Sequence, residues 1–122
     1  MLREVCFLLG PGGAVLWADA SESPVALPDS RGRWEAIWRR REALVEIAHS
    51  HPVGPAAFSV EDESTMAAID GALGRAVRYS VVAPHATIVR AGGETFRMVS
   101  EPWWAGLLRR TSGITRDQEM RR

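Results

Sequence analysis

The segment from His49 to Asp62 constrains this chain most, because it combines the end of a strand, a sharp turn and the start of a helix. His49 and His51 are one residue apart, so on an extended strand both imidazoles point to the same side. The proline and glycine residues that follow reverse the chain. Ser59 followed by Asp62 is typical of a helix N-terminus, and the helix carries a carboxylate back toward the histidines. Two imidazoles, one carboxylate and an open fourth position are the ligand set of a catalytic zinc site.

A simpler interpretation of the same residues has to be weighed beside the metal site. Taken alone, Ser59-x-x-Asp62 is far more often a helix cap than a site, because Asp is favoured in the first turn by the helix dipole. An isolated His-x-His is likewise more often a surface or core feature than a metal site. The two patterns together, at this spacing, favour the site. The interpretations are compatible, since a capped helix is a rigid support for a metal ligand.

The complete pattern resembles the JAMM motif of JAB/MPN-domain metallopeptidases. The matching residues are His49-x-His51-Pro52, the seven residues between His51 and Ser59, and Ser59-x-x-Asp62. That family also has a glutamate on an early strand, in a segment that reads roughly Glu-x-Cys-Gly-x-Leu-x-Gly. Residues 4–10 read Glu-Val-Cys-Phe-Leu-Leu-Gly, with Phe7 at the position of the family glycine. The resemblance covers about residues 2–100 and implies the family fold, a curved mixed sheet between helices.

The resemblance also implies a catalytic zinc site whose ligands are His49, His51 and Asp62. Glu4 would act as general base and then as general acid, and Ser59 would hydrogen-bond the oxyanion or the zinc-bound water. Strand alternation places Glu46 on the opposite face from the histidines, which leaves Glu4 as the better candidate base. The alternative for Glu4 is that it is only the solvated start of the first strand.

The activity implied by the resemblance is hydrolysis of a peptide or isopeptide bond. A chain of 122 residues is too short for the extra loops with which eukaryotic members of the family choose among ubiquitin chains. We therefore expect the substrate to be the C-terminal tail of a ubiquitin-like or sulfur-carrier protein of the β-grasp fold. The alternatives are a non-catalytic scaffold of the same fold, which usually lacks zinc ligands, and a metallopeptidase of broader specificity.

Composition narrows the possible partners and the compartment. The 15 basic and 15 acidic residues balance, so net charge gives no reason to expect nucleic acid or a membrane surface as a partner. The single cysteine, Cys6, excludes an internal disulfide and a cysteine-based zinc site. No run approaches the roughly 20 apolar residues of a membrane span, and no signal peptide is expected, so we predict a cytoplasmic protein. No feature of the sequence indicates an oligomeric state.

The apolar periodicity predicts one α+β domain over residues 1–110, followed by a polar tail over residues 111–122. The first helix should bury Trp34, Ile37 and Trp38, which are spaced at i, i+3 and i+4, and expose Arg33 and the Arg39–Arg41 run. His85 is expected at a surface turn. Strands are predicted over residues 3–9, 14–19, 44–49, 78–83, 87–91 and 95–100. Helices are predicted over residues 31–43, 59–73 and 101–107.

Overall fold

A computed structural model describes residues 1–114 of the chain. It begins with the predicted hairpin, in which β1 (Val5–Leu9) and β2 (Val15–Ala20) pair antiparallel. The short 3-10 turn η1 (Pro11–Gly13) joins them. Gly12 and Gly13 have φ angles of 71° and 80°. Side chains disfavour these left-handed values, so glycine is needed at this turn.

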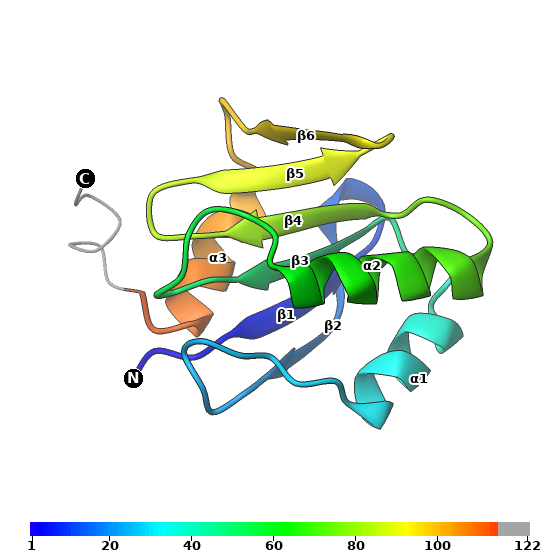
Figure 1. Ribbon diagram of the computed structural model, residues 1–122, viewed down its shortest axis with the longest axis horizontal. Helices are drawn as coiled ribbons and strands as arrows, with labels where there is room; N and C mark the ends of the chain where they lie inside the picture. The colour runs from blue at the N-terminus through cyan, green and yellow to red at the C-terminus, as the bar shows by residue number, and fades with distance from the viewer. Residues whose placement is uncertain (115–122) are drawn as a thin grey trace.

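The sheet has six strands in the order β2-β1-β3-β4-β5-β6 (Figure 1). All neighbours pair antiparallel except β3 and β4, which are parallel. A parallel pair needs a crossover, and the helix α2 (Val60–Leu73) supplies it. The remaining strands are β3 (Glu46–Ser50), β4 (Arg78–Val82), β5 (Thr87–Ala91) and β6 (Glu94–Arg97). The predicted α+β fold with a mixed sheet is confirmed.

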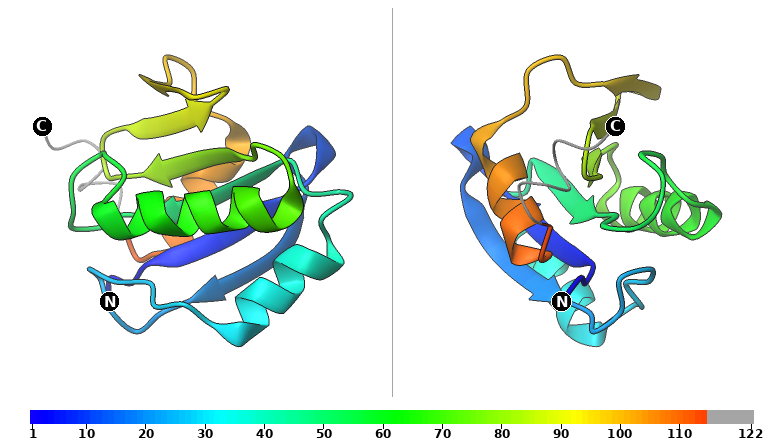
Figure 2. Two further views of the ribbon diagram at one scale, coloured as in Figure 1. Left: turned by 45° about the vertical axis from the view of Figure 1, so that its right-hand side comes forward. Right: turned by 90° about the vertical axis from the view of Figure 1, so that its left-hand side faces the viewer.

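Helices cover both faces of the sheet (Figure 2). Helices α1 (Arg31–Arg39) and α2 lie on one face, and α3 (Trp103–Thr111) lies on the other. The alternation along β1 divides the core accordingly. Cys6 and Leu8 pack with residues of α1 and α2, whereas Val5, Phe7 and Leu9 pack with residues of α3. Phe7, at the position of the family glycine, is therefore a buried core residue beneath α3.

The prediction for the first helix was partly wrong. Trp38 is 52% exposed, and the Arg41 guanidinium lies 4.0 Å above its ring. Arg33, expected on the solvated face, is buried, because Asp19 on β2 accepts hydrogen bonds from its Nε and NH2 atoms. The helix also ends at Arg39 instead of residue 43, since the chain turns there to enter β3.

Helix α3 extends beyond its predicted end. Helix α3 continues to Thr111 instead of stopping at Leu107, and Ser112 and Ile114 are buried. The backbone N–H of Arg3 donates to the carbonyl of Ser112, which ties the two ends of the described chain together. The first residue of the predicted tail, Thr111, is thus the last residue of α3. The rest of the predicted tail, residues 115–122, lies outside the described residues.

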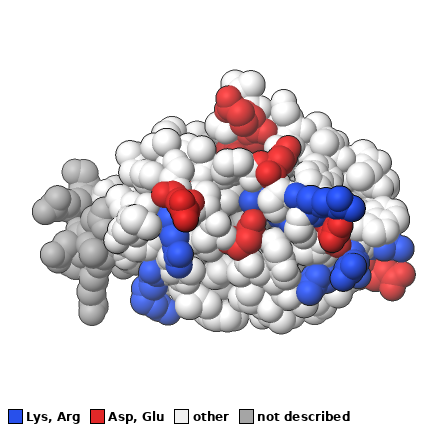
Figure 3. Space-filling model, turned by 90° about the horizontal axis from the view of Figure 1, so that it is seen from below, with Lys and Arg blue, Asp and Glu red and all other residues white. Residues whose placement is uncertain are grey.

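Two surface properties can be stated for the described residues. On the underside of the molecule, arginine and acidic side chains lie beside one another, without a large field of one sign on that face (Figure 3). Among residues 1–114, no helix has both the length and the apolar character needed to cross a membrane.

Besides its apolar packing, helix α3 is held by a nearly buried arginine, Arg109, and this predicts a stability effect. Arg109 donates to both carboxylate oxygens of Glu101, at 2.5 and 2.7 Å, and to the carbonyl of Ala83 at 2.9 Å. Arg109→Ala should lower the free energy of unfolding by about 2 kcal/mol. This is less than the roughly 3–5 kcal/mol of fully buried pairs, because the Glu101 side chain is 30% exposed.

Urea unfolding of the Arg109→Ala protein measures this difference. Arg31→Ala is the matched control, since Arg31 pairs with Glu35 at 3.0 Å but both side chains are largely exposed. Exposed ion pairs of this kind contribute little to the free energy of unfolding, so the Arg31→Ala protein should unfold at the same urea concentration as the wild type. Equal midpoints for the two variants would contradict the prediction.

Candidate metal centre

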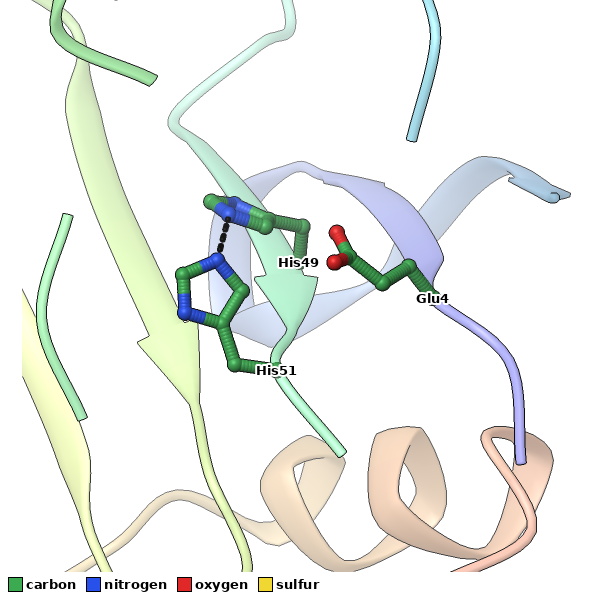
Figure 4. A group of neighbouring side chains, drawn as sticks. All are labelled: Glu4, His49 and His51. Atoms are coloured by element: carbon green, nitrogen blue, oxygen red, sulfur yellow. Dashed lines mark hydrogen bonds between the residues drawn. The ribbon is translucent and has the colours of Figure 1, made fainter. Parts of the chain in front are cut away.

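Glu4, His49 and His51 converge where β1 begins and β3 ends (Figure 4). The antiparallel register pairs Cys6 with His49, so Glu4, just before β1, lies beside the last residues of β3. The two histidines share one face of the sheet, as predicted from their spacing. Glu4, His49 and His51 each offer a ligand atom, and these atoms lie within 4.8 Å of one another. The three residues are close enough to hold a metal ion.

Helix α2 brings a second carboxylate to the histidine pair. Asp62 Oδ1 lies 3.2 Å from His49 Nε2, Asp62 Oδ2 lies 3.3 Å from His51 Nε2, and the two Nε2 atoms are 3.1 Å apart. A tetrahedral zinc ion with bonds of about 2.0–2.1 Å has ligand atoms roughly 3.3–3.4 Å apart. The nitrogen and oxygen donors and their separations therefore fit zinc.

Ser59 and Asp62 form a complete capping box at the start of α2. Ser59 Oγ accepts from the Asp62 N–H at 3.0 Å, and the Ser59 N–H donates to Asp62 Oδ2 at 2.8 Å. The predicted cap is confirmed. The hydrogen bond from the Ser59 N–H to Oδ2 also fixes the orientation of the Asp62 carboxylate that contacts the histidines. The Asp62 carboxylate therefore belongs both to the helix cap and to the candidate site. A catalytic role for Ser59 stays a prediction.

A backbone carbonyl that sequence reasoning missed orients His51. The Pro55 carbonyl lies 3.0 Å from His51 Nδ1 and can only accept a hydrogen bond. The proton of a neutral His51 therefore sits on Nδ1, which leaves Nε2 free to bind a metal, whereas a protonated His51 also donates from Nε2 to Asp62 Oδ2. Pro55 was identified only as a turn residue, and no side-chain pattern marks a carbonyl for this role.

The two carboxylates differ in protonation. Burial raises the pKa of Glu4 to about 7, an effect that His51 opposes and Asp62 reinforces. Burial also acts to raise the pKa of Asp62, but hydrogen bonds to His49 and His51 outweigh it and hold that pKa well below its usual range. Asp62 is thus ionised at neutral pH, whereas Glu4 can exchange a proton there.

Two other polar residues lie where the sequence predicts. Glu46 does not join the cluster: Ser80 Oγ donates to its carboxylate, and Arg78 Nε lies 3.5 Å away. His85 is exposed at the turn between β4 and β5.

A cleft of about 630 Å³ opens beside the cluster. Residues 25–29 form one part of its wall, and residues of α2 form another. Arg33 anchors the first part, because its NH1 donates to the Pro28 carbonyl while its Nε and NH2 donate to Asp19. Sequence reasoning missed this wall, since an irregular loop has no periodic pattern. The inner part of the cleft is lined by Ile37, Ile47, Met66, Ile69 and Tyr79.

Comparison with models of known protein families identifies the family of this chain. A family model described as prokaryotic homologs of the JAB domain matches residues 4–104. The match starts at Glu4, spans the histidine pair and Asp62, and ends in the first turn of α3. A search of curated proteins finds no match to this chain.

Proposed function

This chain belongs to the family of prokaryotic JAB-domain homologs, and on that premise we propose that it is a zinc-dependent peptidase or isopeptidase. One observation carries the proposal. Two imidazoles and a carboxylate lie at tetrahedral separations, next to the buried carboxyl group of Glu4. The geometry supports hydrolysis better than a purely scaffolding role, which needs neither the ligand set nor the base.

The different pKa values of the two carboxylates suggest how the roles divide. Asp62, with its low pKa and its orientation fixed by Ser59, suits a permanent metal ligand together with His49 and His51. Zinc held there supplies a Lewis acid and lowers the pKa of water to about 7. Glu4 suits the base: at neutral pH its carboxylate accepts the proton of the attacking water and returns it to the leaving amine.

Covalent catalysis by the one cysteine is not part of this proposal. Cys6 lines the cleft but is buried, and burial raises the pKa of its thiol to about 12. A thiol in that state is a poor nucleophile at neutral pH. Water activated by Glu4 is therefore the proposed nucleophile. Ser59 also lines the cleft, and because its Oγ accepts from the Asp62 N–H, its own proton can be donated to an oxyanion.

The proposed substrate is the C-terminal tail of a ubiquitin-like or sulfur-carrier protein. The cleft supports this choice because it is a slot between the wall of residues 25–29 and α2, and its inner part is largely apolar. An extended tail could lie along the wall as an added strand, with alternate side chains facing the cleft. A metallopeptidase of broader specificity remains the second candidate for the same site.

The first test is metal content. Protein purified without chelator should contain one zinc ion per chain by elemental analysis, because three residues at tetrahedral separations supply one site. His49→Ala should lose this zinc, whereas His85→Ala should keep it because His85 lies at a surface turn. If the wild-type protein neither contains zinc nor takes it up, the result would favour a non-catalytic scaffold of the same fold.

The second part of the test is cleavage. Zinc-loaded protein should release a reporter fused after the tail of a β-grasp carrier, and His49→Ala should not. Cleavage of unrelated peptides with equal efficiency would favour the broader peptidase. A zinc-loaded protein that cleaves no substrate would overturn the catalytic proposal while leaving the metal site in place.

A further inference from the structure

Ser50 lies between His49 and His51 in the sequence but faces the other side of the sheet. Its side chain points toward α3, as strand alternation requires. Ser50 and Ser112, which follows α3, are both 0% exposed. Ser112 Oγ lies 2.6 Å from Ser50 Oγ. The metal centre is thus connected through the sheet to the C-terminal end of α3, a connection that the proposed mechanism does not use.

The hydrogen bonds around these two hydroxyls form one consistent chain. The Val5 N–H donates to Ser50 Oγ at 2.9 Å. Ser112 Oγ lies 2.7 Å from the Leu108 carbonyl, which can only accept, so the single Ser112 proton is directed there. Ser50 then donates its own proton to Ser112 Oγ. Every donor and acceptor in the chain is satisfied, and all the groups are buried.

The place of this chain in the sheet suggests what it does. Backbone pairing between β1 and β3 ends at Cys6 and His49. Beyond that point the chain still runs beside β4, because the N–H of His51, just after β3, donates to the Val82 carbonyl. At the position where the backbone pairing of β1 and β3 has ended, Ser50 Oγ accepts a hydrogen bond from the Val5 N–H. The hydroxyl thereby sets the distance between the backbone that carries Glu4 and the backbone that carries the histidines.

We propose that Ser50 and Ser112 are positioning residues of the metal centre, whose buried hydroxyl chain from α3 holds the backbone of the ligands His49 and His51 in place, and with it their position relative to Glu4. This inference rests on the proposed metal site. The groups that orient metal ligands typically contribute about 10- to 100-fold in metal affinity or activity. A purely structural role for the two serines would instead affect only stability.

The chain offers a matched control for Ser112. Thr111 Oγ1 donates to the Leu107 carbonyl at 2.8 Å, the same type of bond to the residue four positions earlier that Ser112 makes. Thr111 has no hydrogen bond to Ser50. Ser112→Ala and Thr111→Val each remove one such bond, but Ser112→Ala also leaves the buried Ser50 hydroxyl without an acceptor and should lower the melting temperature more, so zinc affinity and kcat are compared in the folded proteins. Only Ser112→Ala also breaks the connection to the metal centre.

The experiment measures the zinc dissociation constant by competition with a chromophoric chelator, together with kcat on a cleavable tail fusion. We expect Ser112→Ala and Ser50→Ala to weaken zinc binding or lower kcat by about tenfold. Thr111→Val should stay within about twofold of wild type in both. The double variant Ser50→Ala/Ser112→Ala should lose no more than the worse single variant, because both residues act through one chain.

Three outcomes separate this inference from the proposed function. If Ser112→Ala matches Thr111→Val in zinc affinity and in kcat, the positioning role is overturned while the peptidase proposal stands. If the wild type binds zinc but cleaves nothing, the peptidase proposal fails and the zinc constants still decide the positioning role. If the wild type binds no zinc, both are overturned. Should Ser50→Ala fail to fold, the comparison of Ser112→Ala with Thr111→Val remains decisive.

Discussion

Glu4→Gln should retain zinc and lose about 10²–10⁴-fold in kcat, the usual contribution of a general base. Glutamine keeps the shape of the side chain and can still form hydrogen bonds in a site where Glu4 is only 6% exposed. It cannot accept the proton of the attacking water. The zinc ligands His49, His51 and Asp62 are untouched. Elemental analysis and steady-state kinetics on one preparation measure both effects.

Glu46→Gln is the control for this substitution. Glu46 is also buried and its pKa is also raised by burial, but its partners are Ser80 and Arg78 on the opposite face of the sheet. It should therefore keep both zinc and turnover in its folded fraction. A Glu4→Gln protein that loses zinc would show that Glu4 is a metal ligand, which its 4.8 Å grouping with the histidines also permits. A Glu4→Gln protein with unchanged turnover would show that another residue is the general base.

Ser59→Ala should lower both stability and turnover. Loss of the N-cap costs about 0.5–2 kcal/mol, because the Asp62 N–H loses its acceptor. Loss of an oxyanion donor lowers kcat by about 10²-fold or more, with a smaller effect on substrate binding. We expect both effects, measured as a modest drop in melting temperature and a large drop in kcat.

Two further substitutions at Ser59 separate the cap from the chemistry. Ser59→Thr keeps a hydroxyl that can both cap and donate, so this variant should stay partly active. Ser59→Asp can cap the helix, but an ionised carboxylate cannot donate to an oxyanion. That variant should fold and turn over slowly. A Ser59→Asp protein as active as wild type would show that the hydroxyl serves only to cap α2.

Much of the fold and the geometry of the site could be predicted because the deciding interactions are local. The start of α2 at Ser59 depends on residues three positions apart, and its end depends on Gly74, whose φ of 70° suits glycine. Alternation along β3 correctly separated Glu46 from the histidines. The JAMM resemblance was needed to choose Glu4, which is distant in sequence from the other site residues and whose position alone fits a site residue and a solvated strand end equally well.

The errors concern residues whose environment depends on distant partners. Arg33 is buried only because Asp19 on β2 supplies a carboxylate, and helical periodicity does not contain that information. Trp38 is half exposed and lies beneath the Arg41 guanidinium instead of in the core, and helical periodicity alone does not show which side of α1 the rest of the fold covers. Ser112 looks polar in the sequence, and its burial depends on Ser50, which is far away along the chain.

The proposed site draws its metal ligands from two separate elements, and this has a thermodynamic consequence. His49 and His51 belong to the sheet, whereas Asp62 belongs to the first turn of α2. An ion bound by all three would cross-link the helix to the sheet, in the way a disulfide joins two segments. Folding stability and zinc affinity would then be linked. A substitution that destabilises the first turn of α2 would lower the zinc affinity. Conversely, zinc that binds only the folded chain would raise the free energy of unfolding.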